Sequence, residues 1–281
     1  MRFADLQQGA GVLVWVCWLA TAVALCAYRV GLRATTGSGN PPLPALPAPG
    51  VVLDPVRRVL RRPAVWGTGV ASTLFTAQAT VVDSVEDHGR LAATDRPVLA
   101  WLVAHRAPDG TLVMETASRL GGTLGTLVLA AVAVALLVWR RHWWEAATVT
   151  VASAGVAVLV PAAKAFYGRP RPPLAGQLVR ETDLSLPSGH AVGSLVIVGV
   201  VAVVTVRFLR SRLVRAAALG AAASAVALVG VSRLYLGVHW FTDVLAGWFL
   251  GGAWLAVCLA ALQALTAGRA PVGRDGTPAL F

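Results

Sequence analysis

The sequence predicts an all-α fold, a polytopic bundle of helices that crosses a membrane several times. Hydrophobic residues make up 57% of the 281 residues and charged residues only 13%, whereas soluble domains carry about 25% charged residues. The apolar residues are gathered into long runs with few charges, near the roughly 20 residues that a helix needs to cross a hydrocarbon core about 30 Å thick. The composition and these runs exclude a soluble globular protein.

Seven stretches are long and apolar enough to span the membrane. In chain order they are residues 11–28, 64–82, 120–139, 144–166, 189–206, 213–231 and 240–267. The second stretch is rich in Ser and Thr and contains Gln78, so we expect its hydroxyls and its amide to face other helices. A shorter apolar stretch at residues 97–103 cannot cross, and it predicts a helix lying at the interface.

The chain is predicted to have three parts. Residues 1–63 hold the first span and a Pro- and Gly-rich linker at residues 35–49, which we expect to be extended and to have no core of its own. A signal peptide is the alternative for the first span, but only Arg2 precedes it and no A-x-A site follows, so a span is favoured. Residues 64–267 form the membrane domain, and residues 268–281 form an exposed cytoplasmic tail.

Basic residues are distributed unevenly between the two faces of the predicted bundle. When the seven spans alternate in direction, one set of loops carries 14 basic and 3 acidic residues and the other carries 10 of each. The whole formal charge of +11 therefore lies on one face, which the positive-inside rule makes cytoplasmic. This excess indicates contact with the anionic leaflet of the lipid bilayer and no nucleic-acid partner, because no segment mixes basic and aromatic residues on a soluble face.

Three polar clusters abut the ends of predicted spans, and span counting places all three on the opposite, outer face. Their residues are Lys164, Arg169, Arg171 and Pro172; Pro187, Ser188, Gly189 and His190; and Ser232, Arg233, His239 and Asp243. Cys17, Cys26 and Cys258 lie inside apolar runs without the spacing of a metal site or a disulfide framework, so we expect no metal ligands and no cofactor. The convergence of the clusters predicts one polar site.

The first cluster contains the only Lys of the chain. Among 24 basic residues Lys164 alone is not Arg. A snorkelling interfacial cation is the alternative, but Arg would serve that purpose equally well, and a compact ammonium directed at a phosphoryl oxygen explains the choice better. In the second cluster Gly189 follows Ser188 at the start of a span. The N–H groups of a helix N-terminus therefore form an anion site there, with Ser188 also as the N-cap.

The two histidines of these clusters supply reactive groups. His239 and Asp243 are four residues apart, so on a helix they share a face, and the carboxylate can hold one imidazole nitrogen while the other is nucleophilic. The alternative is an interfacial His and a helix-end Asp without contact. His190, at the start of its span, is placed to give a proton to a leaving oxygen. With the cations of the clusters neutralising the transferred group, this set indicates phosphoryl transfer through a covalent phosphohistidine.

The clusters resemble the signature of the type 2 phosphatidic acid phosphatase superfamily, which is K-x6-RP, PSGH and SR-x5-H-x3-D. The chain has KAFYGRPRP from Lys164, PSGH from Pro187 and SRLYLGVHWFTD from Ser232. The resemblance implies a six-helix phosphatase core, here with an extra N-terminal span, and metal-independent cleavage of phosphomonoesters or diphosphates. Soluble vanadium haloperoxidases share the signature, but the predicted spans argue against that branch.

The resemblance also implies a role for each matching position. It implies the catalytic residues His239 as nucleophile, His190 as general acid and Asp243 as orienting carboxylate, and the phosphate-binding residues Lys164, Arg171, Ser188, Gly189 and Arg233.

From these observations we expect a multi-pass lipid-phosphate phosphatase of the cell membrane with its active site on the extracytoplasmic side. Among membrane lipid phosphates we favour a polyprenyl diphosphate, which would connect the enzyme to cell wall biogenesis; phosphatidylglycerol phosphate and phosphatidic acid are the alternatives. A lipid phosphotransferase is a further hypothesis. A catalytically silent lipid-binding membrane protein is another, but it would lack a nucleophile or an acid, and both are present.

Overall fold

The computed structural model describes residues 63–267, which form helices joined by turns and loops without any strand in this range. The predicted span at residues 11–28, the linker at residues 35–49 and the tail at residues 268–281 lie outside the described residues. These three segments, and the division of the chain into three parts, stay predictions.

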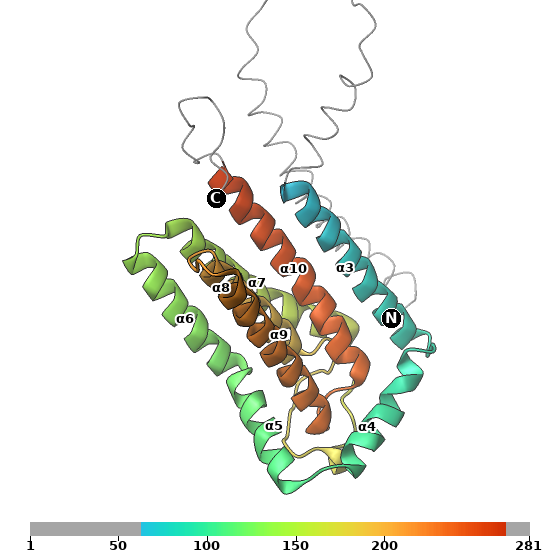
Figure 1. Cartoon of the computed structure of the whole chain (residues 1–281). Coiled ribbons are helices and arrows are strands. Elements are labelled where there is room, and N and C mark those ends of the chain that lie inside the picture. The colour runs from blue at the N-terminus through green and yellow to red at the C-terminus, as the bar shows by residue number, and fades with distance from the viewer. Residues whose placement is uncertain (1–62, 268–281) are drawn as a thin grey trace, which may run out of the picture. The chain divides into compact units, whose positions relative to one another are not determined.

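The described helices form an elongated bundle with one long connection, residues 168–188, between α7 and α8 (Figure 1). In chain order the elements are α3 (Pro63–Glu86), the 3-10 turn η1 (Ala92–Thr94), α4 (Asp95–Ala104), α5 (Pro108–Leu120), α6 (Thr123–Trp139), α7 (Trp143–Tyr167), the 3-10 turn η2 (Leu174–Gly176), α8 (Gly189–Val206), α9 (Arg212–Tyr235) and α10 (Phe241–Ala267).

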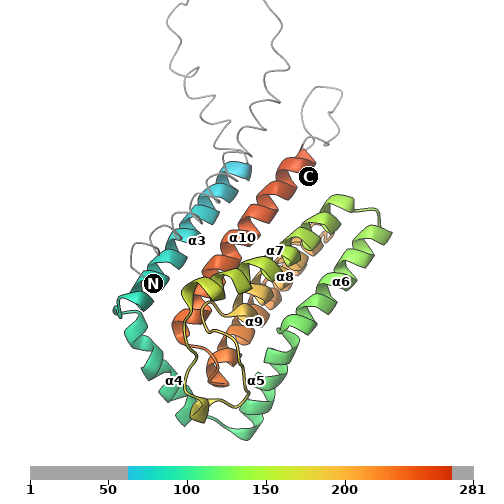
Figure 2. The ribbon, with the colours of Figure 1, turned by 180° about the vertical axis from the view of Figure 1, so that it is seen from behind.

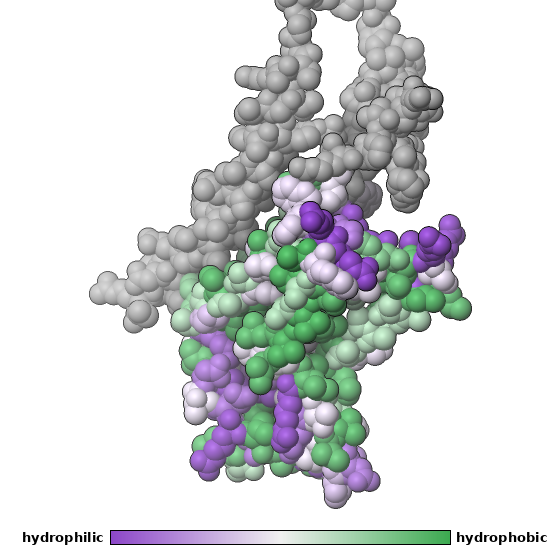
Figure 3. Space-filling view, turned by 90° about the vertical axis from the view of Figure 1, so that its left-hand side faces the viewer, coloured by the Kyte–Doolittle hydropathy of each residue, from purple (hydrophilic) through white to green (hydrophobic). Residues whose placement is uncertain are grey.

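Four of these helices, α7 to α10, are long and apolar enough to cross a membrane, and α5 with α6 makes a fifth if the bent pair is one span. Hydrophobic residues cover the middle of the face shown in Figure 3, and hydrophilic residues gather towards its two ends. Trp139 and Trp143 are exposed at the α6–α7 turn, and Trp101 is exposed in α4, as expected of side chains at the headgroup level of a bilayer. The described part of the chain is a multi-pass membrane bundle.

α3 covers the predicted span at residues 64–82, but it is not among the helices apolar enough to cross. Four of its threonines are exposed and face no other helix among the described residues. Their hydroxyls bond to carbonyls of their own helix, which satisfies them without a neighbour: Thr68, Thr73, Thr76 and Thr80. Gln78 does face another helix, because its Nε2 donates to the Tyr167 hydroxyl of α7 at 3.1 Å. α3 lies alongside α10 in both views (Figures 1 and 2).

The region between α3 and α6 holds two helices. The predicted interfacial helix at residues 97–103 is α4, whereas α5 was not predicted. The predicted span at residues 120–139 is wrong at its start, because a bend of 50° at Gly121 and Gly122 separates α5 from α6. A Cβ on Gly121 would lie 2.2 Å from a side-chain carbon of Val229 in α9. The close packing of α9 against the bend therefore requires a glycine there.

α8 lies at the centre of the bundle, where it packs against α6, α7, α9 and α10. Its Val192, Val196 and Val200 are fully buried in one apolar cluster with Val149 and Ala152 of α7. Because lipid tails are as apolar as these side chains, close van der Waals packing is what favours the contact in a membrane.

Glycines let α10 approach α8 closely. A Cβ on Gly247 would lie 2.9 Å from the carbonyl oxygen of Ser188, and one on Gly251 would lie 3.1 Å from that of Val192. Small residues at such contacts are typical of packed membrane helices. The contact sets the start of α10 beside the start of α8, where the Ser188 N–H donates to the carbonyl oxygen of Asp243 at 3.0 Å.

Candidate active site

All three polar clusters meet at the end of the bundle where α7 ends, α8 begins, α9 ends and α10 begins. Residues 168–188 loop over this end, and α4 and α5 lie beside it (Figures 1 and 2). Arg169 and Arg171 of the first cluster contact Asp243 and His239 of the third. The second cluster joins them through the Ser188 N–H, which donates to the carbonyl oxygen of Asp243. The predicted single polar site is therefore formed by four helix ends and one loop.

His239 lies in the turn between α9 and α10, so the prediction that His239 and Asp243 share one helix is wrong. Their side chains still meet, with the Nδ1 atom of His239 3.3 Å from Oδ2 of Asp243. The reason is local: Asp243 is in the first turn of α10, and its Oδ2 accepts the N–H of Trp240 at 2.8 Å. A carboxylate that bonds back to the N–H three residues earlier is a known way to close a helix N-terminus.

The second imidazole nitrogen of His239 faces the basic side of the site. An Nη1 N–H of Arg171 lies 3.0 Å from Nε2 of His239 and also donates to the Val238 carbonyl oxygen at 2.7 Å. Burial, with a contribution from the nearby arginines, lowers the pKa of His239 to about 4 despite the opposing effect of Asp243. The imidazole is therefore neutral at neutral pH, which a nitrogen nucleophile requires.

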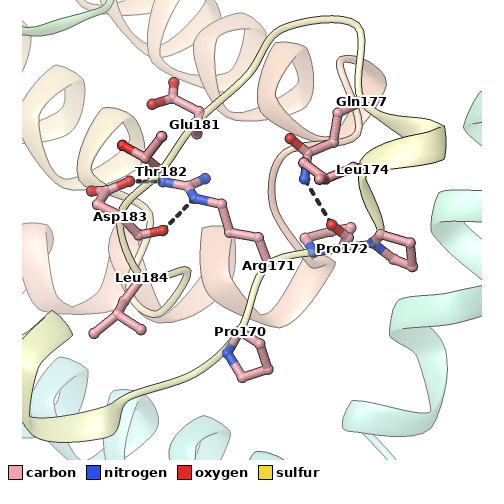
Figure 4. Close-up of a pocket in the computed structure, with 10 residues that line it drawn as sticks. Pro170, Arg171, Pro172, Leu174, Gln177, Glu181, Thr182, Asp183 and Leu184 are labelled. Carbon is pink, nitrogen blue, oxygen red and sulfur yellow. Dashed lines mark hydrogen bonds and ion pairs between the residues drawn. The ribbon is translucent and has the colours of Figure 1, made fainter.

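The basic residues expected to bind phosphate hold two carboxylates of the loop 168–188. Asp183 accepts hydrogen bonds from both Lys164 and Arg171, and Glu181 accepts one from Arg233. Figure 4 shows Arg171 reaching Asp183 within a cavity of about 400 Å³ lined by this loop. Sequence reasoning missed both acids, because a lone carboxylate in an irregular loop belongs to no motif.

Lys164 lies in the last turn of α7 and is only 8% exposed. A snorkelling cation would instead reach into water. Burial by itself would raise the pKa of Asp183, but the hydrogen bonds from Lys164 and Arg171 outweigh burial and lower that pKa to about 2. Asp183 is therefore ionised at neutral pH and neutralises cations that are otherwise free to bind an anion.

Arg233 lies in the last turn of α9 and is 2% exposed. Its Nη1 donates to the Ser118 hydroxyl of α5, and its Nε is buried with no hydrogen-bond partner among the described residues. A buried donor without a partner costs free energy. The unpaired Nε can be satisfied by an anion in the site.

The PSGH segment starts α8 as the sequence predicts. Ser188 is the N-cap, and its Oγ accepts the N–H of Ala191 at 3.4 Å. α8 itself begins at Gly189, and the N–H groups of a helix start attract anions. His190 lines a second cavity of about 480 Å³ together with Arg233, Glu181 and residues of the α5–α6 bend.

The described residues offer no evident metal site: no three His, Cys, Asp or Glu side chains among residues 63–267 come together in a way that could hold a metal ion. Cys258 is buried in α10, and Cys17 and Cys26 lie outside the described residues.

A multi-pass helical bundle with a histidine–carboxylate pair facing a cluster of cations belongs to the class of membrane phosphatases. The model of the PAP2 superfamily matches residues 145–267, and phosphatidylglycerophosphatase B of Bacillus subtilis (strain 168) is 32% identical over 161 residues, which are 57% of this chain and 78% of that protein. The chain belongs to the PAP2 superfamily and is a lipid phosphatase, a hydrolase of membrane lipid phosphates.

A solved structure has the same fold. The crystal structure of the first transmembrane PAP2 type phosphatidylglycerolphosphate phosphatase from Bacillus subtilis superimposes with a TM-score of 0.64 at 26% sequence identity, and the match covers 72% of this chain and 98% of that one.

Proposed function

We propose that this enzyme hydrolyses its lipid phosphate through a phosphohistidine on His239. The observation that carries the proposal is the surroundings of that imidazole, with Asp243 at Nδ1 and Arg171 at Nε2. Asp243 holds the proton on Nδ1, which leaves the Nε2 lone pair for phosphorus. Lys164 and Arg233, which hold loop carboxylates in the structure, are the further donors for the phosphoryl oxygens.

The reaction takes two steps. In the first, Nε2 of His239 bonds to phosphorus while the phosphorus–oxygen bond to the lipid breaks, and His190 gives a proton to the leaving oxygen. In the second, His190 takes a proton from water, the resulting oxygen bonds to phosphorus, and the phosphorus–nitrogen bond breaks. The N–H group of Gly189 lies at the start of α8, whose positive end attracts the phosphate anion, whereas the N–H of Ser188 donates to the carbonyl oxygen of Asp243.

Phosphatidylglycerol phosphate is the substrate we propose, because the relative and the solved structure named above carry that activity in their names. The polyprenyl diphosphate favoured by the sequence analysis stays a prediction, with its connection to cell wall biogenesis. Purified protein in detergent should therefore release phosphate from phosphatidylglycerol phosphate faster than from phosphatidic acid or a polyprenyl diphosphate. Faster release from the polyprenyl lipid would reverse the assignment.

EDTA and vanadate test the metal-free chemistry in the same assay. Release should persist in EDTA, and vanadate should inhibit it by mimicking the five-coordinate phosphorus of the transition state. The His239→Ala protein, purified in parallel, measures contaminating phosphatase. Activity that is lost in EDTA and returns with Mg²⁺ would contradict the proposal.

The single lysine gives a prediction about the phosphate site. Lys164→Arg should slow turnover by roughly 10- to 150-fold, the equivalent of losing one charge-assisted contact of about 1.5–3 kcal/mol in the transition state. A planar guanidinium cannot replace a compact ammonium in a buried pocket that already holds two arginines. The control is Arg212→Lys, at an exposed position at the start of α9. A fully active Lys164→Arg enzyme would show that any cation suffices.

The loop carboxylates give a prediction about substrate affinity. A phosphate must displace Asp183 from Lys164 and Arg171, so Asp183→Asn should lower KM and leave kcat nearly unchanged. Asp183 is half exposed, and exposed ion pairs contribute about 0.2–1 kcal/mol each, so losing two should lower KM by roughly 2- to 30-fold. Asp109→Asn, at an exposed carboxylate of α5, is the control. A raised KM would mean that Asp183 instead orients the cations for substrate.

We also propose that the site opens on the extracytoplasmic side of the membrane, supported by the excess of basic residues on the opposite loops. In this arrangement residues 64–267 form the phosphatase domain, residues 1–63 add the first span and linker, and residues 268–281 are cytoplasmic. A cysteine introduced at Thr182 should react with a membrane-impermeant maleimide in intact spheroplasts. Labelling only after lysis would place the site on the cytoplasmic side.

A further inference from the structure

The carboxylate of Asp243 has a different set of partners on each oxygen. Oδ2 faces Nδ1 of His239 and accepts hydrogen bonds from the Ser185 hydroxyl and the Trp240 N–H. Oδ1 instead accepts an Nη1 N–H of Arg169 at 2.5 Å. Arg169 therefore holds the oxygen that points away from the imidazole, which fixes the rotation of the carboxylate.

Arg169 is in turn held by a second buried carboxylate. Its Nη2 donates to Oδ2 of Asp95 at 2.7 Å, and its Nη1 lies 2.8 Å from the Thr242 hydroxyl oxygen. Asp95 is the first residue of α4 and is 3% exposed. The same carboxylate accepts the Thr242 N–H at 2.9 Å and the Thr242 hydroxyl at 2.7 Å. α4, the loop after α7 and the first turn of α10 are thus joined at one point.

The ion pairs of Arg169 with Asp95 and Asp243 fix the orientation of both carboxylates. A buried ionised carboxylate is costly unless it is paired and hydrogen-bonded, and the planar fork of a guanidinium can serve two carboxylates at fixed angles. The Arg169 guanidinium also lies over the Trp240 ring, 5.7 Å from its centre. Both terminal nitrogens of Arg169 are used in hydrogen bonds to Asp243, Asp95 and Thr242, so the guanidinium is oriented to protein groups.

We propose that Arg169, held by Asp95 and Thr242, is a positioning residue that keeps the Asp243 carboxylate aligned with His239. The inference rests on the proposed function, because it needs the Asp243–His239 pair to act in catalysis. Arg169 contacts no reacting atom; its effect is transmitted through Asp243. Asp95 acts one step further away, by fixing the direction of the guanidinium and the N-terminus of α10 together.

Kinetics of Arg169→Gln test the proposal. Loss of a partner that orients a metal ligand typically costs about 10- to 100-fold in activity, and we expect a loss of the same order for Arg169. The loss should fall on kcat, with KM within about twofold of wild type, because Arg169 binds no phosphate. Arg212→Gln, at an exposed site, should leave both constants unchanged. An unchanged kcat would overturn the proposal, and a raised KM with unchanged kcat would make Arg169 a substrate ligand instead.

A double-mutant cycle separates positioning from a general effect on the fold. If Arg169 acts through Asp243, adding Arg169→Gln to Asp243→Asn should lower the remaining turnover by less than about twofold, since the carboxylate to be aligned is already gone. If the two losses multiply, Arg169 acts independently of Asp243 and the proposal fails. Failure of the proposed function would show differently, as an active His239→Ala enzyme.

The pH profile gives a readout that a purely stabilising residue would not change. The charged and titratable groups near His239 are Asp243, Arg169, Arg171, Arg233 and His190. Removing the positive charge of Arg169 should raise the pKa of His239, so the acid limb of kcat/KM should move to higher pH. If kcat falls while the acid limb of kcat/KM stays at its wild-type pH, the proposed mechanism is contradicted.

Two conservative variants keep the test decisive if Arg169→Gln does not fold. Arg169→Lys retains the charge but cannot reach both carboxylates, and Asp95→Asn retains the volume but not the charge that holds the guanidinium. Each of these two variants should lower kcat, but by a smaller factor than the one expected for Arg169→Gln, and should leave KM unchanged. If both lower only the unfolding temperature in detergent and leave kcat intact, the cluster is structural and the proposal is wrong.

Discussion

The variant His239→Ala is expected to abolish turnover, with kcat at least roughly 10,000-fold below wild type. The methyl group of alanine cannot bond to phosphorus. The other imidazole of the site, His190, shares the second cavity with Glu181 but makes no hydrogen bond to a carboxylate among the described residues, unlike His239. The cations would still bind substrate, so KM should change much less than kcat. The measurement is phosphate release under substrate saturation, with thermal unfolding in detergent to confirm the fold.

The matched control for this variant is His105→Ala. His105 is exposed at the end of α4, where it stacks on Trp101, and its removal should leave kcat unchanged. Turnover by His239→Ala within tenfold of wild type would show that another group attacks phosphorus, and the phosphohistidine proposal would be wrong.

The variant Asp243→Asn is expected to have the second largest effect, a loss of roughly 1,000- to 10,000-fold in kcat. The amide that replaces the carboxylate can donate a hydrogen bond to Nδ1 of His239. The imidazole proton would then move to Nε2, the nitrogen that must attack. The Trp240 N–H and the Ser185 hydroxyl donate to the same Oδ2 that faces Nδ1, so they would lose this acceptor when the amide nitrogen takes its place.

Substrate affinity tells whether this loss comes from the tautomer or from unfolding. The folded Asp243→Asn enzyme should bind vanadate or substrate within severalfold of wild type, because both carboxylate oxygens of Asp243 are bonded to protein groups and none is directed at the phosphate. A kcat equal to that of wild type would mean that the contact of 3.3 Å between Nδ1 and Oδ2 has no function.

The helices of the second half of the chain could be predicted from the sequence because hydropathy alone defines them. The predicted span at residues 189–206 is α8 residue for residue, and those at 144–166, 213–231 and 240–267 lie within or close to α7, α9 and α10. The bend between α5 and α6 could not be predicted, because it depends on the packing of Val229 against Gly121. Such a contact joins residues far apart in the chain.

The residues of the candidate site were predicted where they belong to a motif with fixed spacing. The structure brings those side chains to one end of the bundle, although His239 lies in a turn and not on the helix. Glu181 and Asp183 were missed because their partners are determined only when the loop folds back on α7 and α9. Asp95 was missed because its contact with Thr242 joins residues 147 positions apart. A single acid at the start of a short helix gives no signal of such a partner.

Trapping the covalent intermediate tests the central claim most directly. The enzyme would be mixed with a lipid substrate labelled with ³²P in the transferred phosphate and quenched in alkali within milliseconds. The quenched protein would then be digested, and the labelled peptide would be identified by mass spectrometry. The account predicts label on the peptide that contains His239, stable in alkali and lost in acid as expected of a phosphoramidate, and none in the His239→Ala protein. Label on a different residue, or full turnover with no labelled enzyme at any time, would contradict it.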